Sequence, residues 1–159
     1  MPIKMYILPW ISIVSLLAYI PVLCYLDWNY RDIGTHKIWL PLLAVNIPVV
    51  AAGYLTGYYP AVFLLLDLIV AMAWVLLFYR KGADCAWLVV ITMFLPVHPL
   101  TGVAFLYPFL MYLAIFTAGA FWFVFLDNRI QKKKWSFEMD RGIPYLIPIS
   151  LALIAAVVM

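Results

Sequence analysis

Six long apolar runs alternate with short polar segments along this chain, and this pattern predicts six membrane-crossing helices. A helix satisfies its own backbone hydrogen bonds in lipid, and about 20 apolar residues cross the hydrocarbon core. The pattern therefore predicts an all-α membrane protein, a bundle of about six transmembrane helices forming one domain over residues 1–159. The expected spans cover residues 6–26, 39–55, 60–79, 84–100, 102–126 and 142–159.

Prolines interrupt two of these spans, and a proline removes a backbone hydrogen bond from a helix interior. We therefore expect kinks or early helix ends in 39–55 and 84–100, where the prolines are Pro41, Pro48, Pro96 and Pro99.

Composition excludes a water-soluble protein. The chain is 69% hydrophobic and 11% charged, with a mean hydropathy of +1.08, whereas soluble domains are about 25% charged. Six spans leave no room for a separate soluble domain, and the first run lacks a cleavage pattern, so we interpret it as a retained span. The predicted environment is a lipid bilayer, and nothing predicts nucleic-acid binding despite the net charge of +3.

The positive charges alternate between connecting segments. Residues 27–38, 80–83 and 127–141 carry nine of the ten Lys and Arg residues, while 56–60 and 97–101 carry none. Because positive loops stay in the cytoplasm, this alternation predicts a multi-pass protein of the cell membrane with both termini outside.

Two acids are predicted at the same cytoplasmic face. Asp27 closes the first span and Asp84 opens the fourth. Peptide hydrolysis without a metal or a nucleophilic side chain needs two carboxylates sharing one proton, since one activates water as a base and the other protonates or hydrogen-bonds the scissile carbonyl. As an alternative, both acids are ordinary helix-end residues, and Asp84 caps its helix and favours the N-terminal dipole.

The sequence offers fewer suitable residues for hydrolysis by a nucleophilic side chain or by a metal ion. A Ser or Cys nucleophile needs a His base, but His36 and His98 are predicted in loops at opposite faces. No HExxH or CxxC motif is present, so we expect neither a metal nor a cofactor. Cys24 lies one helical turn before Asp27, and Cys85 is adjacent to Asp84. The two thiols are therefore expected to report whether the two motifs meet.

Two short motifs carry a resemblance to a known family. Asp27, Arg31 and Ile33, in the order D-x-x-x-R-x-I, resemble the first catalytic motif of the archaeal prepilin and preflagellin peptidases, which are GxGD-type membrane aspartyl peptidases. Gly82-Ala83-Asp84 is similar to their second motif, and GIPYLIPISLAL to their final helix. Lys81, Ala83 and Ala86 depart from the usual second motif.

The resemblance implies an aspartic endopeptidase with Asp27 and Asp84 as catalytic residues. Its partner would be a type IV pilin-like or archaellin precursor, with a short basic leader followed by a hydrophobic helix, cut at the cytoplasmic face. Gly82 would let the chain turn sharply into the aspartate-bearing helix.

Further residues have two interpretations each. Asp67, the deepest acid, either hydrogen-bonds between helices or tunes the active site. Arg31 either holds a charge near the site or sets orientation. A second class of function also remains: a small proton-coupled transporter or non-catalytic membrane subunit that uses Asp67 and Asp84. A third possibility is a presenilin-like protease that cuts within the substrate's helix.

Overall fold

The computed structural model describes residues 7–30, 36–78, 82–130 and 145–159, and these residues form six helices and no strand. The prediction of an all-α membrane protein built from about six helices is confirmed. The helices are α1 (Ile7–Tyr30), α2 (His36–Leu55), α3 (Ala61–Phe78), α4 (Gly82–Phe94), α5 (Leu106–Ile130) and α6 (Leu146–Val158).

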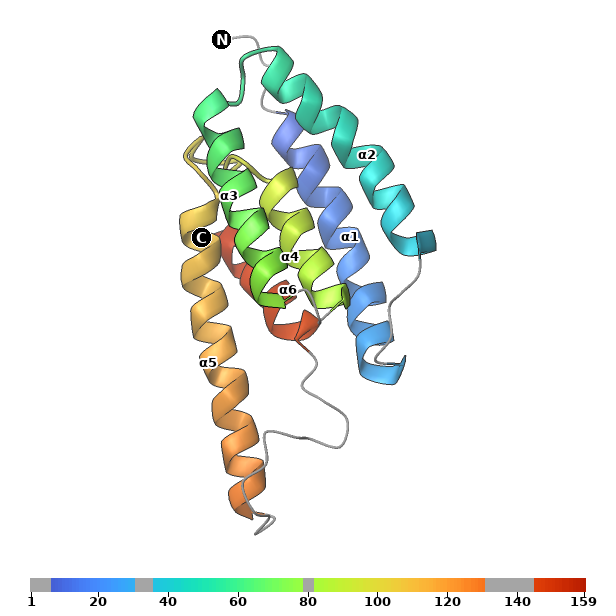
Figure 1. Cartoon of the computed structure of the whole chain (residues 1–159), viewed down its shortest axis with the longest axis vertical. Coiled ribbons are helices and arrows are strands. Elements are labelled where there is room, and N and C mark those ends of the chain that lie inside the picture. The colour runs from blue at the N-terminus through green and yellow to red at the C-terminus, as the bar shows by residue number, and fades with distance from the viewer. Residues whose placement is uncertain (1–6, 31–35, 79–81, 131–144) are drawn as a thin grey trace.

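The helices run alternately down and up the bundle (Figure 1). Helices α1, α3 and α5 end, and α2, α4 and α6 begin, at what we call the lower end, as oriented in Figure 1. The opposite end is the upper end. The first three connections, between α1 and α4, have at most five residues each, and short connections favour antiparallel neighbours.

Two short helices form the centre of the bundle. Helix α4 packs against α2 and α3, and α6 packs against α1, α4 and α5. Both have 13 residues, so each is about 20 Å long. Most of their side chains are buried, whereas α3 buries only two of its 18 residues, Asp67 and Ala71.

Three longer helices surround this centre and are apolar enough to cross a membrane. They are α1 over Ile7–Asn29, α3 over its whole length and α5 over Leu106–Leu126. Large apolar side chains project outward from them, including Leu76 and Phe123, which are more than 70% exposed. Lipid tails are the environment in which such surfaces are stable.

The fourth predicted span, 84–100, is wrong in its length. Helix α4 ends at Phe94, and the chain continues as a non-helical segment to Phe105, buried over residues 95–99 and exposed over residues 100–103. Pro96 explains the early end, because proline cannot donate to a helix carbonyl and disfavours helical backbone in the residue before it. Helix α2, in contrast, continues through Pro41 and Pro48, as helices in lipid often do.

Candidate active site

Asp27 lies in the last turn of α1, and its side chain is 8% exposed. The sequence predicted that Asp27 would follow the end of a span at residue 26, but α1 continues to Tyr30. The carboxylate is therefore held on helical backbone at the lower end of the bundle. Arg31, the next residue of the first motif, lies outside the described residues.

Asp84 is the third residue of α4, and its side chain is partly exposed. Gly82 begins this helix with a φ of +26°, in the left-handed region that favours glycine. Residues 79–81, which would complete the sharp turn expected at Gly82, lie outside the described residues. An acid in the first turn of a helix is stabilised by the N-terminal dipole, so the local backbone favours Asp84 here whatever else the residue does.

The two acids lie at the same end of the bundle because α1 runs toward the lower end and α4 starts there (Figure 1). Their environments differ, since Asp27 is buried and Asp84 is half-buried. Two carboxylates in different surroundings can have different pKa values, so that one can act as the base and the other as the acid.

A serine of α6 connects the helices that carry the acids. The Trp87 indole Nε1 of α4 donates a 3.2 Å hydrogen bond to Ser150 Oγ. The Cys24 thiol of α1 lies within hydrogen-bonding reach of the same hydroxyl. Ser150 is 1% exposed, so this contact is inside the bundle.

Each acid lies three residues from a side chain that meets Ser150, which is Cys24 for Asp27 and Trp87 for Asp84. Asp27 follows Cys24 by three residues on the descending helix, and Asp84 precedes Trp87 by three residues on the ascending one. Three residues of α-helix rise about 4.5 Å. Asp27 and Asp84 therefore each lie about one turn of their own helix nearer the lower end than the residue that meets Ser150.

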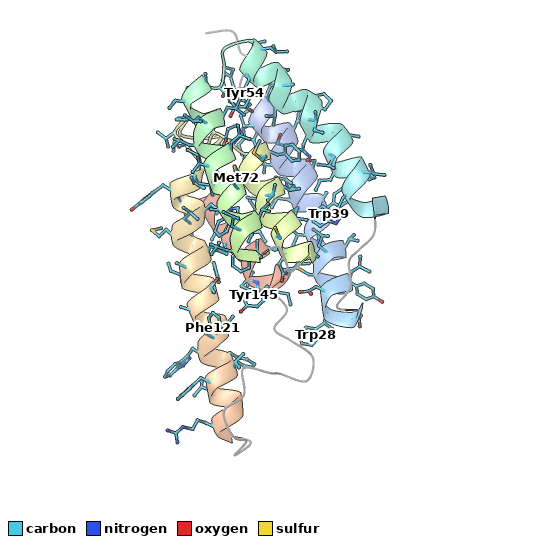
Figure 2. The ribbon with its side chains drawn as sticks, viewed as in Figure 1. Trp28, Trp39, Tyr54, Met72, Phe121 and Tyr145 are labelled. Carbon is cyan, nitrogen blue, oxygen red and sulfur yellow. The ribbon has the colours of Figure 1, made fainter. Side chains whose placement is uncertain are left out.

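Tyr145 lies where α6 begins, near enough to Asp84 for the two groups to interact electrostatically. Burial, and then the nearby carboxylate of Asp84, raise the pKa of the Tyr145 hydroxyl. The Tyr145 ring also meets Phe121 of α5 edge-on, with 6.3 Å between ring centroids. Figure 2 shows Tyr145 in the lower half of the bundle, below Trp39. Helices α4 and α6 thus start side by side, in agreement with the Trp87–Ser150 contact further up.

Trp87 of α4 also packs against an aromatic side chain of α2, Trp39. The rings of Trp39 and Trp87 have centroids 6.1 Å apart. Trp87 is fully buried, so its position between Trp39 and Ser150 fixes the rotation of α4. Sequence reasoning did not single out Ser150, Trp87 or Tyr145. The available signal was a serine in an apolar helix, where polar side chains commonly hydrogen-bond to neighbouring helices.

Asp67 is not part of this arrangement. It lies in the upper half of α3, is 4% exposed, and accepts a 3.4 Å hydrogen bond from the Tyr54 hydroxyl of α2. Tyr54 is labelled near the upper end in Figure 2. Eleven residues, or about 16 Å of helix, separate Asp67 from the lower end of α3 at Phe78. The interhelical hydrogen bond that the sequence allowed for Asp67 is present.

The two cysteines face different helices. Cys24 faces Ser150 of α6, whereas the Cys85 thiol contacts the Trp74 carbonyl oxygen of α3 at 3.7 Å. Both are free thiols. His98 lies at the upper end, in the segment between α4 and α5, and so is remote from both acids. Among the described residues, no group of three His, Cys, Asp or Glu side chains is arranged to hold a metal ion.

Comparisons with known proteins assign no family to the chain. No family model matches the sequence, and no curated protein and no solved structure matches it significantly.

Proposed function

We propose that this protein is a membrane aspartyl endopeptidase of the prepilin peptidase type, with Asp27 and Asp84 as its catalytic residues. The observation that carries the proposal is that both acids lie at the lower end of the bundle, where α1 ends and α4 begins, each three residues from a residue that meets Ser150. The two sequence motifs that contain the acids support it independently.

The proposed reaction is hydrolysis of one peptide bond. One carboxylate takes a proton from water, whose oxygen attacks the scissile carbonyl carbon, while the other, protonated, hydrogen-bonds the carbonyl oxygen. The tetrahedral intermediate collapses as the C–N bond breaks and the leaving amine takes up a proton. Asp84, the more exposed acid, is the one that water reaches more easily.

The charge distribution supports a cytoplasmic site in a multi-pass protein of the cell membrane. Nine of ten Lys and Arg residues lie in or beside the sequence segments that join helices at the lower end. Under the positive-inside rule this end faces the cytoplasm and both termini lie outside. A precursor with a basic leader and a hydrophobic helix would then meet the acids where its helix leaves the bilayer.

Cleavage of such a precursor tests the proposal directly. Purified protein is incubated in detergent or vesicles with a pilin-like or archaellin precursor, and the released leader is quantified. Asp27→Asn and Asp84→Asn each remove one ionisable oxygen with little change of shape. Each variant should lose at least about 10²-fold in rate, the usual contribution of general acid–base catalysis. Undiminished cleavage by either variant removes that residue from the mechanism.

Asp67→Asn is the matched control, because it makes the same change at a buried acid in the upper half of the bundle. We expect it to cleave at close to the wild-type rate. A small proton-coupled transporter is the competing function, favoured by the burial of Asp67 within a candidate span. That function predicts the reverse: Asp67→Asn abolishes proton uptake into vesicles, and no variant cleaves a precursor.

A further inference from the structure

The Ser150 hydroxyl is the polar group shared by the helices that carry the two acids. It accepts the hydrogen bond of Trp87 Nε1 from α4 and lies against the Cys24 thiol of α1. A hydroxyl has one hydrogen to donate and two lone pairs that accept, so a single serine can bond to both neighbours at once. Ser150 is buried, and water does not compete for these positions.

Apolar contacts alone do not fix helices at a given depth in lipid. Lipid tails are as apolar as leucine, so sliding or rotating an apolar helix against its neighbour changes little hydrophobic free energy. A hydrogen bond has a short range and a preferred direction, and therefore selects one depth and one rotation. Helices α4 and α6 are short and mostly apolar, so this selection matters most for them.

We propose that Ser150 is a positioning residue that holds α1 and α4 in register, so that Asp27 and Asp84 stand at one level. This inference rests on the proposed peptidase function for its catalytic consequence, but its structural content does not. Ser150 acts through Cys24 and Trp87, each three residues from an acid on the same helix.

Cross-linking measures the register without any catalytic activity. Asp27→Cys and Asp84→Cys are introduced together, with Cys85→Ala and Cys24→Ser to remove the native thiols while keeping a donor at position 24. A short bifunctional thiol reagent then joins positions 27 and 84 in the intact protein in membranes. Adding Ser150→Ala should lower the cross-linking rate about three- to tenfold, the effect expected for losing one or two neutral hydrogen bonds.

Ser12→Ala is the matched control. Ser12 is also a fully buried serine, but its Oγ has no hydrogen-bond partner among the described residues. The change removes the same atom from the bundle interior without removing a contact between helices. Cross-linking should be unchanged in this variant.

Trp87→Phe tests the same hydrogen bond from the other side and keeps the inference testable should Ser150→Ala fold poorly. It removes the indole N–H and leaves the serine hydroxyl. If the Trp87–Ser150 hydrogen bond sets the register of α1 and α4, the variant that combines Ser150→Ala with Trp87→Phe should cross-link no more slowly than the slower of the two single variants. Strictly additive effects of the two changes would overturn the inference.

Cleavage kinetics supply the second readout. Ser150→Ala should lower kcat about three- to tenfold and leave KM unchanged, because substrate binding is retained while the acids are misplaced. Ser150→Thr restores the hydroxyl and should recover part of the loss.

The outcomes separate this inference from the proposed function. Cross-linking that depends on Ser150, in a protein that cleaves no precursor, supports the positioning role and removes the peptidase assignment. Cross-linking that ignores Ser150 overturns the positioning role and leaves the peptidase assignment standing. Failure of positions 27 and 84 to cross-link in any background overturns both.

Discussion

His98 donates a 3.0 Å hydrogen bond from Nε2 to the backbone carbonyl oxygen of Ala156 in the last turn of α6. That carbonyl is one of those that a helix end leaves without an internal donor. The Nδ1 atom of the same ring accepts from the backbone N–H groups of Leu100 and Thr101, at 3.3 Å each. A neutral imidazole with its hydrogen on Nε2 satisfies all of these contacts.

This histidine ties the segment between α4 and α5 to the end of α6. Its ring is 3% exposed and stacks on Phe105, with 5.9 Å between centroids. The segment folds back on itself through an isolated bridge between Val97 and Ala104, with Gly102 at a φ of +69°. The upper ends of the two central helices are therefore joined by side-chain and backbone hydrogen bonds.

We expect His98→Ala to destabilise the protein by about 1–3 kcal/mol, because it leaves the buried carbonyl of Ala156 without its donor. Thermal unfolding in detergent measures the loss. Thr101→Ala is the control, since its exposed side chain lies in the same segment. Equal stability of His98→Ala and the wild type would show that the hydrogen bond contributes nothing.

Replacement of Gly53 of α2 by alanine is predicted to destabilise the protein. A Cβ atom there would overlap the ring of Tyr59, which is 2% exposed and packs edge-on against Tyr54. Because the Tyr59 ring is almost fully buried, Gly53→Ala should cost about 1–3 kcal/mol, as overpacking of a core usually does.

Gly119→Ala is the matched comparison for this prediction. It lies inside helix α5, and an added Cβ meets nothing within 4 Å. Alanine is favoured over glycine in a helix by up to about 1 kcal/mol, so this variant should unfold at the same or a higher temperature. The two variants moving in the same direction would contradict the packing described for Gly53.

The number and order of the helices followed directly from the sequence, because every apolar run is bounded by charges, glycine or proline. Their lengths did not. The run from Cys85 to Val97 is apolar except for Thr92, but α4 stops at Phe94. Hydropathy cannot distinguish lipid from a protein interior, and residues 95–99, which follow α4, are buried inside the protein.

For the candidate site, the sequence singled out Asp27 and Asp84 but not the buried side chains near them. The common level of Asp27 and Asp84 was inferred from their positions at helix ends, and the structure shows both at the lower end. Ser150 was missed, because contacts between helices depend on rotation about each helix axis, which six mostly apolar helices do not encode in their hydropathy. The sequence left open whether Asp67 tunes the active site, and the structure pairs it with Tyr54 in the upper half of the bundle.

A polar contact between α1 and α2 gives a prediction for helix association. Asn46 Nδ2 donates to Ser15 Oγ and to the Leu42 carbonyl oxygen, at 2.8 Å each, and the Ser15 hydroxyl donates to the Ser12 carbonyl oxygen. Asn46 is fully buried. Such interhelical hydrogen bonds average about 0.6 kcal/mol in membranes, so Asn46→Ala should be only mildly destabilising.

A double-mutant cycle isolates this contact. Asn46→Ala, Ser15→Ala and the double variant are unfolded under the same conditions, and the coupling free energy is the difference from additivity. We expect about 0.5–1.5 kcal/mol of favourable coupling. A coupling of zero would mean that the two side chains are adjacent without stabilising the helix pair.

The position of the cut distinguishes the proposed peptidase from a protease that cuts within a substrate helix. The acids lie in the last turn of α1 and the first turn of α4, so the reacting atoms are at the lower end of the bundle. Mass spectrometry of the products should therefore place the cut at the boundary between the basic leader and the hydrophobic helix. A cut several residues inside the apolar stretch would instead favour the presenilin-like alternative.

The pH dependence of cleavage follows from two carboxylates that must be in different protonation states. At low pH both are protonated and no base remains, and at high pH both are ionised and no acid remains. The rate should therefore rise and then fall with pH, and its two limbs belong to the pair rather than to either residue. Unfolding temperatures measured over the same pH range check that the protein stays folded. A rate that rises to a plateau and does not fall would mean that only one carboxylate takes part in proton transfer.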